Sequence, residues 1–182
     1  MKENKYITPK FITAADIKKI RKKLGVTQKE FAELVQVSKP TVERWERNQE
    51  NITGPIVMLL QMLDKYPEYV DFIKVPPKKL PVRLWYMHNQ KVCTIIEVDE
   101  LNKKVTAVNY TDNVMFRAFG SVENPDYAMY TEFLESRCFP ESRDKMKLVL
   151  REIDLPFYDP FMIIEKTRGR MAEDDFWIKI ER

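Results

Sequence analysis

Six polar side chains that could contact a nucleic acid are concentrated in the first third of the sequence. They are Thr27, Gln28, Ser38, Lys39, Thr41 and Arg44. Hydroxyl and amide groups donate hydrogen bonds to phosphate oxygens, and lysine and arginine neutralise phosphates or pair with the O6 and N7 atoms of guanine. These side-chain types therefore predict contacts with double-stranded DNA, if the backbone presents them on one surface.

The surrounding residues predict two short helices joined by a tight turn. Thr27 followed three positions later by Glu30 has the spacing of a capping box, so we expect a helix to begin there. Ser38 is a suitable N-cap for a second helix, and Pro40 lies early in it, where a missing N–H costs nothing. Residues 36–38 are then the turn. Two helices joined in this way can place the second helix in the major groove of DNA.

Position on these helices suggests a role for each polar side chain. The amide of Gln28 and the backbone N–H groups at the first helix start can hold a phosphate. Ser38, Lys39 and Thr41 lie at the start of the second helix, where base edges are expected. Arg44, one turn later, can reach a guanine or a phosphate. Each cation that pairs with guanine contributes about 1–3 kcal/mol.

Two neighbouring residues have competing interpretations. Glu43 can accept from the amino group of cytosine, or it can simply be a solvated glutamate. Trp45 can stack on a base, but its spacing from Val42 predicts that it faces the core. The whole segment also has a purely structural interpretation: a bundle of four or five helices that resembles a DNA-binding domain but does not bind DNA.

Further helices are predicted on both sides of this pair. Thr13, with Asp16 in the capping-box position, begins an amphipathic helix that Gly25 ends. Pro55 begins a fourth helix that runs to Lys65, and a short fifth helix is predicted within residues 67–73.

Charge and composition divide the chain into two parts. Residues 1–79 contain 16 Lys and Arg against 10 Asp and Glu, whereas residues 80–182 contain 15 against 18. We therefore expect an arm at 1–12, a helical domain at 13–74, a proline-containing linker at 75–79 and a second domain at 80–182.

The second part changes from strand periodicity to helix periodicity. Strands are predicted at 80–87, 91–98, 103–110 and 114–119, helices starting at Pro125 or Asp126, at Ser142 and at Asp159, and a last strand at 176–180. Strands followed by helices indicate an α+β domain with an antiparallel meander. The predicted fold class is α+β overall, an all-α helix-turn-helix bundle followed by this domain.

The segment from Thr27 to Glu46 closely resembles the Cro/CI-type, or XRE, helix-turn-helix family. Residues 53–60 look like the variant found in MqsA- and HigA-type antitoxins and related repressors. The resemblance implies a homodimer that binds two-fold DNA sites. Gln36 departs from the family, which usually has glycine at the turn. Gln36 must then adopt a left-handed conformation, at a cost of about 1 kcal/mol.

The second part has a faint resemblance to domains found beside HipA-like kinases. It depends mainly on the stretch from Tyr158 to Trp177, which holds a basic cluster, a glycine turn and an acidic cluster. This stretch is either a recognition loop for a protein or an internally ion-paired connection. The resemblance implies a toxin-like kinase as the partner of residues 80–182.

Enzymatic and cofactor chemistry have little support in the sequence. His88, Cys93 and Cys138 lack the paired spacing of a zinc site, and Cys93 is interpreted as a small buried residue. Glu173, Asp174 and Asp175 are consecutive, so they cannot all face one ion. The four glycines form no phosphate loop. We expect no metal, no cofactor and no catalytic site.

The expected location is the cytoplasm. The first residues contain no apolar core typical of a secretion signal, and the longest apolar run, residues 56–60, is too short to span a membrane. Two widely separated cysteines suit a reducing compartment.

Two functions from different classes follow. The first is a sequence-specific, autoregulatory transcriptional repressor of antitoxin type that binds DNA as a homodimer. The second is a protein that sequesters a toxin or a phage or host protein, with DNA binding secondary.

Overall fold

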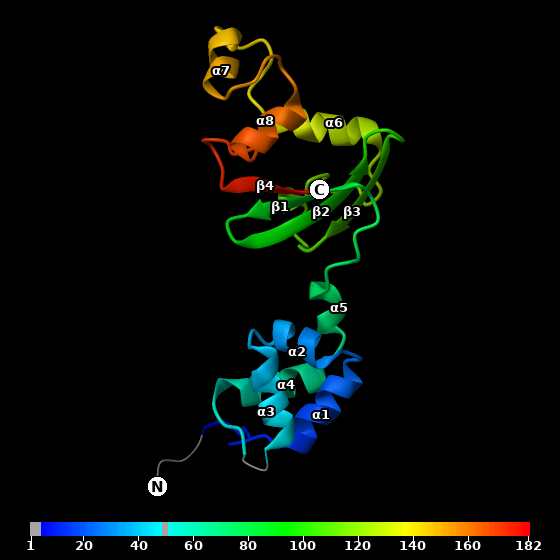
Figure 1. The fold of residues 1–182 in the computed structure, drawn as a ribbon, viewed down its shortest axis with the longest axis vertical. Helices are drawn as coiled ribbons and strands as arrows, with labels where there is room; N and C mark the ends of the chain where they lie inside the picture. The colour runs from blue at the N-terminus through cyan, green and yellow to red at the C-terminus, as the bar shows by residue number, and fades with distance from the viewer. Residues whose placement is uncertain (1–4, 49–50) are drawn as a thin grey trace. The chain divides into compact units, whose positions relative to one another are not determined.

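The computed structural model describes residues 5–48 and 51–182 of the chain (Figure 1). The chain divides into two compact units, Met1–Val75 and Pro76–Arg182. Each unit has its own hydrophobic core. The fold class is α+β, as the sequence predicts: helices form the first unit, and an antiparallel sheet with helices forms the second.

In the described part of the first unit, the regular secondary structure is helical apart from one β-bridge. Its helices are α1 (Ala14–Lys23), α2 (Gln28–Leu34), α3 (Lys39–Arg47), α4 (Pro55–Lys65) and α5 (Tyr69–Ile73). The capping boxes predicted at Thr13 and Thr27 are both present, and Ser38 caps α3. Ile12 and Ile52 exchange backbone hydrogen bonds of 2.9 Å, which fix the chain before α1 to the loop before α4.

The core of the first unit holds α1, α2, α3 and α4 together. Ile17 from α1, Phe31 from α2, Val42 from α3 and Leu60 from α4 are completely buried in one cluster. Burial of a side chain of this size contributes about 1.5–3 kcal/mol. This shared core determines which face of α3 is left for solvent.

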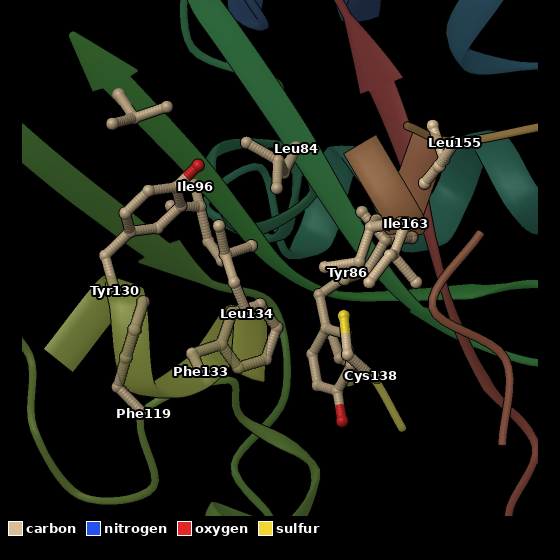
Figure 2. Packing of buried hydrophobic residues seen from close by; sticks show 14 of the residues in the cluster. Leu84, Tyr86, Ile96, Phe119, Tyr130, Phe133, Leu134, Cys138, Leu155 and Ile163 are labelled. Atoms are coloured by element: carbon tan, nitrogen blue, oxygen red, sulfur yellow. The ribbon is translucent and has the colours of Figure 1, made fainter. Parts of the chain in front are cut away.

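The second unit contains a four-stranded antiparallel sheet with the order β3-β2-β1-β4. Its elements are β1 (Val82–His88), β2 (Lys91–Asp99), β3 (Lys104–Asn109), the 3₁₀ turn η1 (Val114–Phe116), α6 (Tyr127–Ser136), α7 (Met146–Glu152), α8 (Pro160–Thr167) and β4 (Phe176–Glu181). Figure 1 shows α6 and α8 on one side of the sheet. Side chains from that face of the sheet and from these two helices form the main core, which includes Leu84, Ile96, Tyr130, Phe133 and Ile163 (Figure 2).

The opposite face of the sheet holds a buried ion pair that anchors the chain entering the second unit. Arg83 and Glu97 pair across β1 and β2, and both are almost inaccessible. Glu97 also accepts from the backbone N–H groups of Lys79 and Leu80, at 2.8 and 3.1 Å, and Arg83 donates to the carbonyl of Pro76 at 2.7 Å. Residues 76–80 therefore pack as part of the second unit.

Two predicted elements of the second unit are wrong. Residues 114–119 do not form a strand, because the ring of Phe116 packs on His88 at 4.5 Å between centroids and the N–H of Ala118 donates to the Thr94 hydroxyl. These contacts draw the segment across the sheet and prevent pairing along an edge. Ser142 does not cap a helix, because it lies inside a turn closed by the N–H of Arg143 and the carbonyl of Pro140. The helix begins four residues later, at Met146.

Candidate nucleic-acid interface

At the start of α3, the hydroxyl groups of Ser38 and Thr41 are joined by a hydrogen bond. Ser38 accepts a hydrogen bond from the backbone N–H of Thr41 at 3.3 Å, and the two hydroxyl oxygens lie 2.8 Å apart. One hydroxyl donates to the other, so one hydroxyl hydrogen remains for a ligand. The capping interaction thus places both side chains at the end of α3 that the sequence assigns to base edges.

The two predicted cations of α3, at its first residue and in its second turn, are both exposed to solvent. Lys39 forms an exposed ion pair with Glu43 at 3.2 Å, one turn along the helix. Such exposed pairs contribute about 0.3–0.5 kcal/mol, so Lys39 can exchange this partner for a phosphate or a base at little cost. Arg44 is exposed, and no ion pair holds it among residues 5–48 and 51–182. Both cations are therefore available to an anionic ligand.

Thr27 and Gln28, at the start of α2, are held differently. Thr27 accepts from the N–H of Glu30 at 3.3 Å and donates its own N–H to the Glu30 carboxylate at 2.8 Å. Gln28 is half-buried, and its amide nitrogen donates to Glu46 at 2.8 Å. An amide nitrogen has two hydrogens, so one remains for a phosphate while the other orients the side chain.

Glu46 is the residue of this region that the sequence analysis missed. Its side chain projects from the inward side of α3 and is only 4% exposed. Arg21 of α1 donates to both of its oxygens, at 2.6 and 3.2 Å, and Gln28 of α2 donates to one of them. Arg21 also donates to the carbonyl of Val26 at 3.2 Å. One carboxylate therefore connects α1, α2 and α3.

The charge of Glu46 is maintained by these partners. Burial by itself would raise the pKa of Glu46, but the hydrogen bonds from Arg21 and Gln28 outweigh it and lower the pKa. The hydrogen bond to Glu46 correspondingly raises the pKa of Arg21. A signal for the burial of Glu46 was present in the sequence: it is four residues after the buried Val42, so a helix places both on the same inward face.

Two residues of the motif behave as the sequence predicts. Gln36 adopts the left-handed conformation, with φ of 56°, where the related sequences usually have glycine. The N–H of Val37 then donates to the carbonyl of Ala32 at 2.9 Å, which closes the turn after α2. Trp45 is half-buried and packs against the core, so it belongs to the structural side of α3.

Five of the six predicted contact residues thus lie at the starts of α2 and α3, and Arg44 is exposed further along α3. The structure brings Ser38, Lys39, Thr41 and Arg44 together on α3, and it connects Gln28 to the same helix through Glu46. Contact of these side chains with DNA remains a prediction. Their arrangement is suited to a duplex, because a helix with hydroxyls and cations on its solvent side can enter the major groove.

Comparison with known proteins agrees with this geometry for the first unit. Residues 17–62 match the helix-turn-helix family, a span that begins inside α1 and ends inside α4. Residues 17–62 are therefore a helix-turn-helix domain, and the match supports a sequence-specific DNA-binding regulator of the XRE type. No curated protein matches the chain. In the described part of the chain, no helix has the length and apolar character needed to cross a membrane.

Proposed function

We propose that the protein is a transcriptional repressor that binds its own operator as a homodimer. The observation that carries this proposal is the polar start of α3, where Ser38, Lys39 and Thr41 lie at the end of a helix that the core and Glu46 hold in place, with Arg44 exposed one turn later. A pre-organised polar surface of this kind loses little conformational entropy when it binds. A two-fold operator follows from a homodimer, since each copy supplies one reading helix.

The autoregulatory and antitoxin part of the proposal has separate support. Residues 53–60 resemble antitoxin repressors, and in the structure they include the glycine-proline start of α4. The faint resemblance of residues 80–182 to domains found beside HipA-like kinases supports a surface for a second protein in the second unit. The proposed partner of residues 80–182 is a toxin-like kinase.

A groove in the second unit supports a partner-binding role. It has a volume of about 1110 Å³ and lies between the β1–β2 turn, residues 110–116 and residues 170–177. His88, Phe116 and Trp177 supply rings to its lining. Its charged residues are Lys91 and Arg170 together with Asp112, Asp174 and Asp175. Aromatic side chains and arginine are the residue types that most often anchor protein interfaces. The predicted recognition stretch 158–177 contributes its last part to this groove.

The DNA-binding proposal is tested with the DNA just upstream of the gene. The wild-type protein should shift this DNA with an affinity that falls steeply with salt. The double substitution Lys39→Ala with Arg44→Ala should weaken binding at least tenfold, because each cation contributes about 1–3 kcal/mol if it pairs with guanine. A matched control is Lys147→Ala with Arg151→Ala on α7, which removes the same charge from exposed positions of the second unit.

Two results would reject the site assignment: no shift by the wild-type protein, or equal affinities for the two double variants. The partner-binding role has its own test. The product of the adjacent gene should co-purify with the wild-type protein, and Trp177→Ala with Arg170→Ala should weaken that association. If the partner binds while operator DNA does not, the second candidate function, sequestration of a protein, is favoured.

A further inference from the structure

The two edges of the sheet in the second unit differ in how they are protected. β4 is one edge, and two of its outward N–H groups meet partners: Phe176 donates to the Asp174 carboxylate at 3.0 Å, and Ile178 donates to the carbonyl of Arg168 at 2.7 Å. The end of α8 and Asp174 therefore cover the first half of this edge. β3 forms the other edge (Figure 1).

The backbone of β3 has three residues that face away from the sheet. The N–H of Tyr110, directly after β3, donates to the carbonyl of Cys93 on β2 at 2.9 Å. Successive residues of an antiparallel strand alternate in direction, so Val105, Ala107 and Asn109 point their backbone groups outward. Within residues 5–48 and 51–182, no hydrogen bond to these three N–H groups is formed from outside the sheet.

The sequence of β3 offers little protection against pairing with another strand. Edge strands are commonly protected by charged side chains, proline or a bulge. The central residues of β3 are Val105, Thr106, Ala107 and Val108, and its pairing with β2 is regular. Lys104 is its only charged residue, at the first position. An unprotected edge of this length is a template for one more strand.

We propose that β3 pairs with β3 of a second copy, so that two second units share one continuous antiparallel sheet. Outward-facing residues must meet outward-facing residues, which allows a two-fold register centred on Ala107 of both copies. Val105 of each copy then lies opposite Asn109 of the other. These three residue pairs form about six backbone hydrogen bonds. The inference names the interface of the homodimer proposed above and depends on that part of the proposed function.

Residues on both sides of β3 are complementary in this register. Leu101, in the β2–β3 turn, is 95% exposed, and Met115, beyond the other end of β3, is 80% exposed. In an antiparallel pair, the segment before β3 of one copy lies at the same end of the shared sheet as the segment after β3 of the other, which brings these exposed apolar side chains to one end. Lys103, before β3, and Asp112, after it, are brought to one end in the same way. Neither Lys103 nor Asp112 has an ion pair within the described part of the chain. A second copy therefore supplies both apolar cover and opposite charge.

The competing surface for a second copy is the exposed side of α4. Met58 and Met62 there are 50% and 52% exposed, so they allow a matched comparison. The test uses the full chain and measures its oligomeric state by sedimentation across a dilution series. Two edge variants are compared with one control: Ala107→Pro, Leu101→Lys with Met115→Lys, and the control Met58→Gln with Met62→Gln.

Each edge variant removes a different part of the interface and leaves the sheet intact. Proline at position 107 lacks only an outward N–H, which β2 does not use. Lysine at the two exposed positions opposes apolar contact without entering the core. We expect the wild type and the control to be dimers, and each edge variant to dissociate at least about a hundredfold more readily. Circular dichroism shows whether each variant is folded.

Hydrogen exchange gives the second readout. The amides of Val105, Ala107 and Asn109 should exchange more slowly at high protein concentration, where the dimer forms, and this dependence should disappear in the lysine variant. A wild type that stays monomeric, folded edge variants that remain dimeric, or a control that becomes monomeric would each overturn the proposal. DNA binding by a monomer would leave the proposed DNA-binding function intact, so the two failures are distinguishable.

Discussion

The substitution Glu46→Gln tests whether one buried carboxylate holds the three helices of the motif together. Glutamine has the same shape but one accepting oxygen, and it has no charge. The oxygen that now bonds Arg21 Nε at 2.6 Å can be kept. The other oxygen, which accepts from Arg21 Nη2 at 3.2 Å and from Gln28 at 2.8 Å, becomes an NH₂ group. Gln28 can rotate its amide and recover one bond, but Arg21 cannot.

The expected cost follows from this count of hydrogen bonds. One charge-assisted hydrogen bond is lost, which is worth about 1.5–3 kcal/mol, and the Arg21 cation is left with a neutral partner. Complete removal of one partner from a buried pair costs about 3–5 kcal/mol, but the Arg21 side chain is 18% exposed and glutamine retains one bond. We therefore expect Glu46→Gln to lower the free energy of unfolding of the first unit by about 2 kcal/mol.

Hydrogen exchange of amides in α1, α2 and α3 measures the free energy of unfolding of the first unit alone. The matched control is Glu43→Gln, the same change on the same helix at an exposed ion pair with Lys39, which should cost less than about 0.5 kcal/mol. Equal effects of the two substitutions would refute the reasoning. Gln28 also loses its original orientation, so DNA affinity at a temperature where the variant is folded should fall as well.

The remaining predictions concern pH and two backbone positions. Because the pKa of Glu46 is lowered in the folded state, its charge stabilises the protein above the unfolded pKa of about 4.3, and this contribution is lost as pH falls further. The stability difference between wild type and Glu46→Gln should therefore shrink below about pH 4.3 in denaturation measured across a pH series. Gln36→Gly should raise the unfolding free energy by about 0.5 kcal/mol in urea denaturation, since φ is 56° there and the strain relieved exceeds the added chain entropy. Gly169→Ala should lower the unfolding free energy of the second unit by about 1–3 kcal/mol, because φ is +59° and a Cβ atom would lie 3.2 Å from Ile178 and 3.3 Å from Arg137. Unchanged hydrogen exchange of the β4 amides would contradict this prediction.

The first unit follows closely from its sequence because its signals are local. Caps at Thr13, Thr27 and Ser38 act over three residues, and the structure contains all of them. The left-handed conformation of Gln36 was predicted from the resemblance to the XRE family, which usually has glycine at this turn. The Arg21–Glu46 pair was not predicted, because it joins residues 25 positions apart and only the packing of α1 against α3 brings them together.

In the second unit, local sequence patterns are insufficient to predict the structure. Residues 114–119 have the composition of a strand, but Phe116 finds aromatic partners on the sheet and the chain crosses it. The sequence left the stretch that contains the acidic cluster as either a recognition loop for a protein or an internally ion-paired connection. In the structure Asp174 pairs with the buried Arg137 of the α6 end, at 2.6 Å, and Arg137 also donates to the carbonyl of Gly169. Such pairs depend on tertiary packing.

The central claim is that the first unit selects a DNA sequence through the solvent side of α3. The most direct measurement is selection of bound sites from a random double-stranded DNA library with the wild-type protein, followed by the same selection with Arg44→Ala. The claim predicts a two-fold consensus for the wild type and relaxed preference at defined positions of each half-site for the variant. The claim would be contradicted if the selected DNA contained no enriched sequence, or if both proteins selected the same consensus.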